Sequence, residues 1–313
     1  IEYLGKEGIC PEIIDDDSDT WTHALPAYTG IRRKMELESC TLVSGGMVTV
    51  EYELVYKLFK STVIMRVILN GALRRADLKL RVIWNEQRRL LKLRIPTAFP
   101  GGVFSSEIPY GFIERAADGR EWPIQRWTAF TGTTGAGLAI LNDGVYSCSA
   151  EPGTINLTLL RSPMYAHHEP MHPRPDLHHR YVDQGEHEFH LQLLPYGEKT
   201  PKSEFSRHAL ELNQPPVYTV ESVHPGDLPG EQSFCRINRD SPALISVIKR
   251  SEDDDGWIIR AYESSGRPAV ADIDFFSLGI TKRFSFKAFE IKTIKISDAD
   301  RSISETNLLE RFP

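Results

Sequence analysis

An alternation of apolar and polar residues between positions 48 and 58 constrains the fold of this chain more than any other feature. The apolar members of the alternation are Val48, Val50, Tyr52, Leu54, Tyr56 and Leu58. Successive side chains of a β-strand point to opposite faces of a sheet, so a period of two predicts a strand with one buried and one exposed face. The pattern recurs at Leu78, Leu80, Val82 and Trp84, and this half of the chain shows no helical period of 3.6 residues. The sequence therefore predicts an all-β protein with very little helix.

The arrangement of these segments predicts two domains in a chain of 313 residues. We expect a large antiparallel β-sandwich, similar to a supersandwich, over residues 1–200 and a smaller C-terminal β-sandwich over residues 217–313. Residues 201–216 are more polar and are expected to form a linker. Apolar residues at helical spacing predict the one helix of the chain there, over residues 203–212. In the second domain, Asp253-Asp254-Asp255-Gly256 between two apolar runs predicts a hairpin turn.

Charge and cysteine content exclude several classes of function. The formal net charge is −6 and the isoelectric point is about 6.0, which does not favour nucleic acid or an anionic membrane as a partner. No apolar run approaches the roughly 20 residues that span a bilayer, and no signal peptide opens the chain. The four cysteines form no CxxC pair, so we expect reduced thiols, no structural zinc and a cytoplasmic location. Because the first residue is Ile1 and not Met, we expect a fragment of a longer polypeptide.

An acidic run, Asp15-Asp16-Asp17-Ser18-Asp19, lies near the start of the chain. A calcium-binding EF-hand loop needs Gly at its sixth position and Glu at its twelfth. Counted from Asp15, these positions hold Thr20 and Pro26, so an EF-hand is excluded. We expect a solvated acidic loop that ends at a buried Trp21.

Histidine is concentrated in one stretch. Seven of the ten histidines are His167, His168, His172, His178, His179, His187 and His190. Several prolines accompany them, and proline removes a backbone donor and fixes φ, so residues 164–182 are expected to form a long irregular loop. Clustered histidines can bind a transition metal, but their spacing here matches no known zinc motif. A solvated or substrate-facing loop is the interpretation that we prefer.

Several short motifs follow one another in a fixed order. They are Trp84-Asn85-Glu86, Gln125-Arg126-Trp127, Leu141-Asn142-Asp143-Gly144-Val145-Tyr146, Leu157-Thr158-Leu159-Leu160-Arg161-Ser162-Pro163 and Asp183-Gln184-Gly185-Glu186-His187-Glu188-Phe189. In this order they resemble the C-terminal β-sandwich region of the α-mannosidases of glycoside hydrolase family 38, of the bacterial or cytosolic type. The resemblance extends into the final strands, and thus covers most of the chain.

The resemblance implies where the chemistry lies. In that family the nucleophilic aspartate, and the aspartate and histidine ligands of a zinc-like divalent metal, belong to an N-terminal α/β domain. This sequence shows no alternation of helices and parallel strands that such a domain requires. The resemblance therefore implies that this chain contains no catalytic residue, no metal ligand and no cofactor, and that it is inactive alone.

Three residues are candidates for contact with substrate. In relatives of this kind an arginine from the β-region reaches the mouth of the sugar site, and the resemblance assigns that place to Arg161. A guanidinium offers a planar fork of donors suited to sugar hydroxyls. Asp143 and Tyr146, in the neighbouring motif, are the other two candidates. The alternatives stay open: Arg161 as a structural partner of Asp183 or Asp143, and Asp143 as a turn residue.

Two functions from different classes fit these observations. In the first, the chain is the C-terminal part of an α-mannosidase-like enzyme. It supports its own N-terminal catalytic domain and lines one side of the cleft for a mannose-containing oligosaccharide, and association into a homo-oligomer is left open. In the alternative, it is a free-standing carbohydrate-binding module. Its aromatic platform for sugar would come from Trp122, Trp127, Tyr146, Tyr165 and Tyr181.

Overall fold

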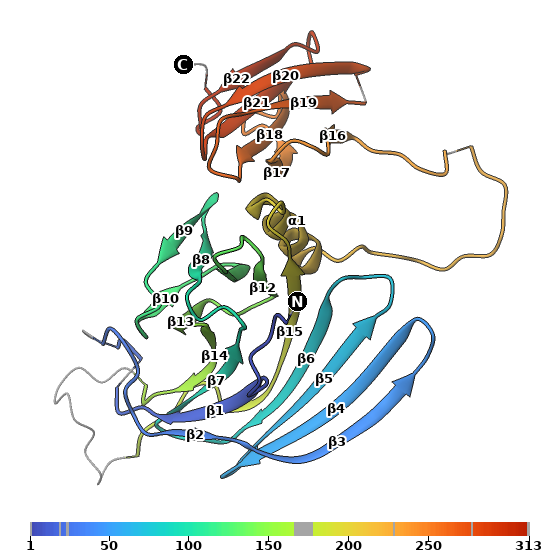
Figure 1. The fold of residues 1–313 in the computed structure, drawn as a ribbon. Helices are drawn as coiled ribbons and strands as arrows, with labels where there is room; N and C mark the ends of the chain where they lie inside the picture. The colour runs from blue at the N-terminus through green and yellow to red at the C-terminus, as the bar shows by residue number, and fades with distance from the viewer. Residues whose placement is uncertain are drawn as a thin grey trace. The chain divides into compact units, whose positions relative to one another are not determined.

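A computed structural model of the chain describes residues 2–18, 20–22, 25–165, 178–227, 229–276 and 278–311. The chain divides into two compact units (Figure 1), each of which is described by itself. The first unit holds residues 1–107 and 113–200, and the second holds residues 108–112 and 201–313. Within the described residues the regular structure consists of 22 strands and one helix, so the all-β prediction is confirmed.

The first unit contains a six-stranded and a nine-stranded antiparallel sheet. The six-stranded sheet has the order β10 (Glu121–Pro123), β13 (Ser147–Glu151), β14 (Thr154–Ser162), β7 (Arg89–Pro96), β1 (Cys10–Asp15) and β2 (Arg32–Lys34). The nine-stranded sheet has the order β3 (Glu36–Gly45), β4 (Thr49–Leu58), β5 (Ser61–Asn70), β6 (Ala76–Trp84), β15 (Gly185–Tyr196), β12 (Gly137–Asn142), β11 (Trp127–Thr131), β8 (Val103–Ile108) and β9 (Gly111–Arg115). β15, the last strand of this unit in the sequence, lies between β6 and β12 (Figure 1).

The core of this unit lies between the two sheets, as the period of two requires. Along β6, Leu78, Leu80, Val82 and Trp84 are buried. They share one apolar cluster with Leu91, Leu93 and Ile95 from the six-stranded sheet. The residues between them on β6, such as Lys79 and Arg81, lie on the opposite face of the sheet and are exposed. Each sheet therefore has one core face and one face directed away from the core.

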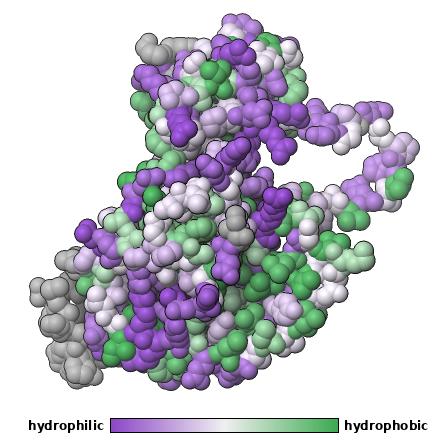
Figure 2. Space-filling model, viewed as in Figure 1, coloured by the Kyte–Doolittle hydropathy of each residue, from purple (hydrophilic) through white to green (hydrophobic). Residues whose placement is uncertain are grey.

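The free end of the nine-stranded sheet leaves apolar side chains uncovered. All ten residues of the edge strand β3 are exposed. Its pairing with β4 shifts register twice, and such bulges protect an edge strand from pairing with another chain. The large exposed apolar side chains at this end include Leu42, Val43, Met47, Val48 and Leu69. Figure 2 shows apolar residues gathered over this part of the sheet.

The second unit contains a smaller sandwich and the helix. One sheet has the order β16 (Cys235–Ile237), β19 (Ala269–Phe275) and β20 (Ile280–Phe286). The other has the order β17 (Ala243–Arg250), β18 (Gly256–Glu263), β21 (Ile291–Ser297) and β22 (Ile303–Thr306). The two sheets share an apolar cluster that includes Ile259, Ile273, Phe284 and Ile294. β17 and β18 form the hairpin predicted around Asp253–Gly256.

The predicted helix is present as α1 (Lys202–Asn213). It buries Phe205 and Ala209 on one side, which are residues at the helical spacing that predicted it. It ends ahead of Pro215 and Pro216, where the missing N–H of proline prevents continuation. Residues 201–216, expected to be a linker, thus contain a helix and group with the second unit.

Candidate functional site

A β-bulge near the end of β14 decides which face of the six-stranded sheet Arg161 occupies. β14 pairs with β7 without interruption up to Thr158, and the register then shifts by one residue before Leu160. A bulge adds one residue to one strand, and because side chains alternate, every residue beyond it changes face. Arg161 lies opposite Leu90, on the face directed away from the core, and Ser162 lies on the core side.

On that outer face, the guanidinium of Arg161 is held by the acidic segment that follows β1. Its Nε donates to Oδ2 of Asp16 at 2.6 Å, and its Nη2 donates to Oγ of Ser18 at 2.5 Å. Both charged side chains are largely buried, with exposed fractions of 15% for Arg161 and 2% for Asp16. The ring of Tyr28 lies 5.4 Å from the guanidinium carbon. Asp183, one of the ion-pair partners expected from the sequence, accepts the main-chain N–H of Arg161 at 3.5 Å.

Asp16 belongs to a row of three aspartates that pair with different arginines. The pairs are Asp15 with Arg33 (2.9 Å) and Arg89 (3.3 Å), Asp16 with Arg161 (2.6 Å) and Asp17 with Arg88 (2.5 Å). Burial works to raise the pKa of Asp15, but hydrogen bonds from its two arginines outweigh burial and lower that pKa. The expected solvated loop ending at a buried tryptophan is therefore wrong, because arginines distant in sequence bind the run while Trp21 is 58% exposed.

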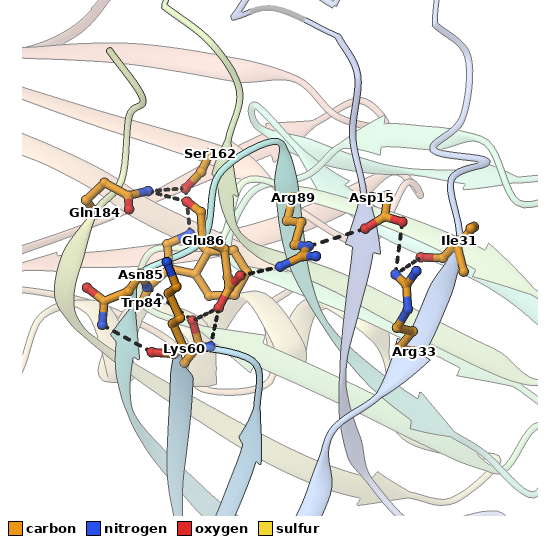
Figure 3. A network of polar contacts seen from close by, with 11 residues as sticks. Asp15, Ile31, Arg33, Lys60, Trp84, Asn85, Glu86, Arg89, Ser162 and Gln184 are labelled. Atoms are coloured by element: carbon orange, nitrogen blue, oxygen red, sulfur yellow. Dashed lines mark hydrogen bonds and ion pairs between the residues drawn. The ribbon is translucent and has the colours of Figure 1, made fainter. Parts of the chain in front are cut away.

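A network of polar contacts joins three of the sequence motifs beside this row (Figure 3). Oγ of Ser162 accepts from Nε1 of Trp84 at 2.5 Å and from Nε2 of Gln184 at 2.8 Å. Nε2 of Gln184 also donates to the main-chain carbonyl of Glu86 at 2.6 Å. The carboxylate of Glu86, only 2% exposed, accepts from the main-chain N–H of Lys60, from Ser61 and from Arg89. Residues from the Trp-Asn-Glu, Arg-Ser-Pro and Asp-Gln-Gly motifs thus meet, and the protein itself supplies the hydrogen bonds of their buried groups.

Two residues in the left-handed region of φ flank Arg161. Arg88 has φ 53° and Asp183 has φ 56°. The main-chain N–H of Arg88 donates to the carbonyl of Ser162 at 2.9 Å, and its carbonyl accepts from Asp16 at 2.8 Å. Neither residue is glycine, so each conformation costs about 1 kcal/mol or more and persists only where the surroundings impose it. This end of the sandwich is therefore a rigid construction.

A second set of motifs meets at the turn after β12. The side chain of Asn142 accepts from the main-chain N–H groups of Gly144 (3.2 Å) and Val145 (2.8 Å) and donates to the carbonyl of Gln125 (2.9 Å). This arrangement fixes the turn and places Asp143, whose Oδ1 accepts the main-chain N–H of His190 at 3.0 Å. The Asn-Asp-Gly motif thus forms a turn that is stabilised by side-chain hydrogen bonds and that connects the Gln-Arg-Trp segment to β15.

The three candidate substrate residues lie in different places. Arg161 is on the outer face of the six-stranded sheet, and Asp143 lies beside β15 in the nine-stranded sheet. Tyr146 is 68% exposed and precedes β13. Of the residues suggested for an aromatic platform, Trp127 is fully buried and Trp122 packs against the core, whereas Tyr146 and Tyr165 are exposed. The sequence motifs thus identified residues at which separate strands are joined by hydrogen bonds. The pairing of Arg161 with Asp16 was not evident from their spacing in the sequence.

The outer face of the six-stranded sheet, here called the covered face, buries further charged residues. Nζ of Lys92 donates to Oε2 of Glu121 at 2.5 Å and to Oγ of Ser149 at 2.9 Å, and Lys92 is only 2% exposed. Burial lowers the pKa of Lys92, against the opposing influence of Glu121. Glu12 is also 2% exposed; burial raises its pKa, outweighing the attraction of Arg32 and other cations.

No group of three or more histidine, cysteine, aspartate or glutamate residues in the described ranges is arranged to hold a metal ion. His167, His168 and His172, from the histidine-rich stretch, lie outside the described residues. No helix in the described part of the chain is long and apolar enough to cross a membrane.

Two family models match the chain, and both describe C-terminal domains of one family. The model described as "Glycosyl hydrolases family 38 C-terminal domain" matches residues 8–176. The model described as "Glycosyl hydrolases family 38 C-terminal beta sandwich domain" matches residues 243–313. The two matches fall on the large and the small sandwich respectively.

Curated relatives carry α-mannosidase names. "Alpha-mannosidase" of Saccharomyces cerevisiae is 23% identical over 353 residues, which cover 100% of this chain and 31% of the relative. "Alpha-mannosidase G" of Dictyostelium discoideum is 26% identical over 205 residues, which cover 61% of this chain and 17% of the relative. The chain thus spans less than a third of the length of either relative.

A solved structure shares the fold. The crystal structure of an alpha-mannosidase from Enterococcus faecalis V583 matches with a TM-score of 0.74 at 14% identity, over 92% of this chain and 38% of that chain. Because the first family model alone matches more than half of the chain, the chain belongs to glycosyl hydrolase family 38 and carries the C-terminal domain of that family.

Proposed function

We propose that this chain is the non-catalytic β-sandwich part of an α-mannosidase-like glycosidase, which supports a catalytic domain and lines one side of the cleft for a mannose-containing oligosaccharide. The family match and the α-mannosidase names of the relatives support the reaction class. The contact surface would be the end of β14 that carries Arg161. The rigid hold on that residue by Asp16 and Ser18 is the observation that carries the proposal.

A rigid scaffold is what a residue needs in order to position a substrate. Functional side chains work best when their own rotamers are fixed by surrounding contacts. The bulge turns Arg161 away from the core, and Asp16 orients its guanidinium. Arg88 and Asp183, whose φ angles lie in the left-handed region, constrain the backbone of the neighbouring segments. The left-handed conformations of Arg88 and Asp183 cost stability, which is expected where a position serves function.

The hydrolytic chemistry is assigned to a catalytic domain that acts together with this chain. Retaining glycoside hydrolysis needs two carboxyl groups about 5–5.5 Å apart, one as nucleophile and one as acid and base. The carboxylates near Arg161 are instead engaged with arginines, as Asp15, Asp16 and Asp17 show. A divalent, zinc-like metal would likewise belong to the catalytic domain, and a cytoplasmic location remains part of the proposal. We therefore expect the chain alone to show no turnover of an aryl α-mannoside, and turnover that survives chelation and repurification would contradict this.

The role of Arg161 is tested by Arg161→Lys in the enzyme that contains this chain and its catalytic domain. Lysine keeps the charge beside Asp16 but loses the planar fork. We expect kcat/KM to fall by about 10- to 100-fold, which corresponds to about 1–3 kcal/mol. Arg33→Lys is the matched control, because Arg33 pairs with the neighbouring Asp15. A similar loss of thermal midpoint in both variants, with kcat/KM unchanged in both, would show that Arg161 is only structural.

A further inference from the structure

A cleft of about 460 Å³ lies on the face of the nine-stranded sheet that is directed away from the core, here called the open face. Its volume lies within the range of about 300–1,000 Å³ that is usual for ligand pockets. Strands β4, β5, β6 and β15 form its floor, and Asp143 forms part of its wall. No residue of the Arg161 cluster contributes to it.

Strand register assembles the floor from two neighbouring rows of side chains. In the first row Glu53 lies opposite Arg66, Arg66 opposite Lys79, and Lys79 opposite His190. In the second row Ile64 lies opposite Arg81, and Arg81 opposite Glu188. The lining thus contains three carboxylates (Glu53, Asp143 and Glu188) and three permanent cations (Arg66, Lys79 and Arg81), whose formal charges sum to zero.

Ion pairs on the open face use the two arginines and leave the lysine between them available. Nε of Arg66 donates to Glu53 at 3.0 Å. Arg81 donates to the two oxygens of Glu186 at 2.5 and 2.9 Å. Lys79 enters none of the ion pairs that the structure shows on this face, although it lies directly opposite Arg66. Like charges opposite one another destabilise a sheet, so the position of Lys79 is not explained by strand pairing.

His190 lies opposite Lys79 on the neighbouring strand β15, and Asp77 orients its imidazole ring. Its Nε2 lies 2.8 Å from Oδ1 of Asp77, which also accepts from Gln192 at 2.8 Å. Burial works to raise the pKa of Asp77, but the hydrogen bonds from His190 and Gln192 outweigh burial and lower it. Because this carboxylate is ionised, it accepts the proton on Nε2, and Nδ1 of a neutral His190 is then an acceptor.

We propose that this cleft binds a neutral saccharide of one or two rings. Each sugar hydroxyl both donates and accepts, and the cleft sets the donor Lys79 among the acceptors Glu188 and Asp143. The zero sum of charge disfavours a phosphate or another strongly charged ligand. Ile64 supplies an apolar contact for the C–H face of a ring. The site is independent of the proposed function, since it requires neither a catalytic domain nor Arg161.

Titration calorimetry and saturation-transfer NMR with methyl α-mannoside and an α-linked mannobiose test this proposal on the chain itself. We expect saturable binding with a Kd of roughly millimolar strength. Lys79→Gln and Glu188→Gln should each weaken it at least tenfold. The matched control is Lys57→Gln, which removes the same charge from an exposed β4 residue that pairs with Glu38 and does not line the cleft. Lys57→Gln should bind as the unaltered chain does.

The outcomes separate the proposal from its competitors. Thermal midpoints close to that of the unaltered chain verify that each variant is folded. Absence of saturable binding by either saccharide overturns the proposal, and so does undiminished binding by Lys79→Gln. Binding of inorganic phosphate that weakens with added salt, in the absence of a saccharide signal, would also overturn it by identifying an anion site. Mannoside hydrolysis is not part of the readout, so failure here leaves the proposed function untouched.

Discussion

The covered face and the open face of the large sandwich carry charged residues of the same kinds in opposite circumstances. On the covered face Lys92 is 2% exposed and bound to Glu121. On the open face Lys79 is exposed and Arg81 is 52% exposed, although Arg81 also has a carboxylate partner. The two faces differ in what lies over their charged side chains. The ring of Tyr28 lies 5.6 Å from Nζ of Lys92, whereas Lys79 lines a cleft.

This difference indicates which charged residues contribute to stability and which can bind a ligand. Breaking a buried ion pair strands a charge that water cannot reach, which is strongly destabilising. An exposed pair gains little, because water and salt screen it and its long side chains must be ordered. We therefore expect substitutions on the covered face to change stability, and substitutions on the open face to change binding without changing stability.

The largest effect is expected from Glu121→Gln. The amide keeps the shape of the side chain near Ser147 and Thr158 but removes the charge that balances Lys92. Loss of one partner of a buried pair costs about 3–5 kcal/mol, measured as the free energy of unfolding in urea. The double variant Lys92→Met/Glu121→Gln should recover most of it. A loss in the single variant no greater than that of a surface substitution would remove the contrast between the two faces.

A smaller effect is expected from Asp16→Asn, at the edge of the covered face. The substitution removes the charged acceptor of the Arg161 Nε and leaves the guanidinium largely buried. A charge-assisted hydrogen bond of this kind contributes about 1–3 kcal/mol. The neighbouring Asp17→Asn is the control, because Asp17 is 84% exposed and its pair with Arg88 should contribute less than about 1 kcal/mol. Equal losses in the two variants would show that burial does not distinguish the members of the acidic row.

The pH dependence of stability tests burial on the covered face through the titration of Glu12, which lies 3.5 Å from Arg32. Burial raises the pKa of Glu12 above its unfolded value of 4.5. The resulting stability is fully present below that value and is lost as pH rises through the folded pKa, because the unfolded chain releases its proton first. Glu12→Gln does not titrate, so its stability relative to the unaltered chain should increase as pH rises above the unfolded value of 4.5. A flat difference in the thermal midpoint as pH rises above that value would contradict the predicted effect of burying this carboxylate.

The smallest effect is expected on the open face. Glu186→Gln removes the bidentate ion pair with Arg81, yet both side chains are about half exposed. Water replaces the lost hydrogen bonds at this site, so no resolvable shift of the thermal midpoint is expected in a calorimetric scan. A clear decrease would mean that the open face is stabilised by its charges, and the comparison would then have to be abandoned.

Local pattern predicted much of the fold. The alternation from Leu78 to Trp84 predicted both the strand and its buried face, and helical spacing predicted α1 to within about a residue. These signals are local because they follow from the geometry of a single element. The order of strands in a sheet is not local: β15 lies between β6 and β12, and nothing in its own sequence indicates which neighbours it will have.

The candidate site was less predictable, for the same physical reason. The motifs identified Arg161, Ser162 and Asn142 as notable positions, but an ion pair between Arg161 and Asp16 spans 145 residues of sequence. The rows of the open-face cleft exist only once four strands are placed in register, so Lys79 carried no signal of its own. Aromatic content suggested Trp127 for a sugar platform, but this side chain is fully buried, because the hydrophobic effect favours burial of large aromatic side chains.

The bulge in β14 makes this strand sensitive to the number of its residues. Leu159 is the extra residue that lets Arg161 face outward and Ser162 face the core. A missense change in the gene alters one side chain and leaves the rest in place. Loss of the codon for Leu159 would exchange the two faces of everything beyond it, so that Asp16 and Trp84 would lose their partners at once. We therefore expect this segment to tolerate amino-acid substitutions better than insertions or deletions.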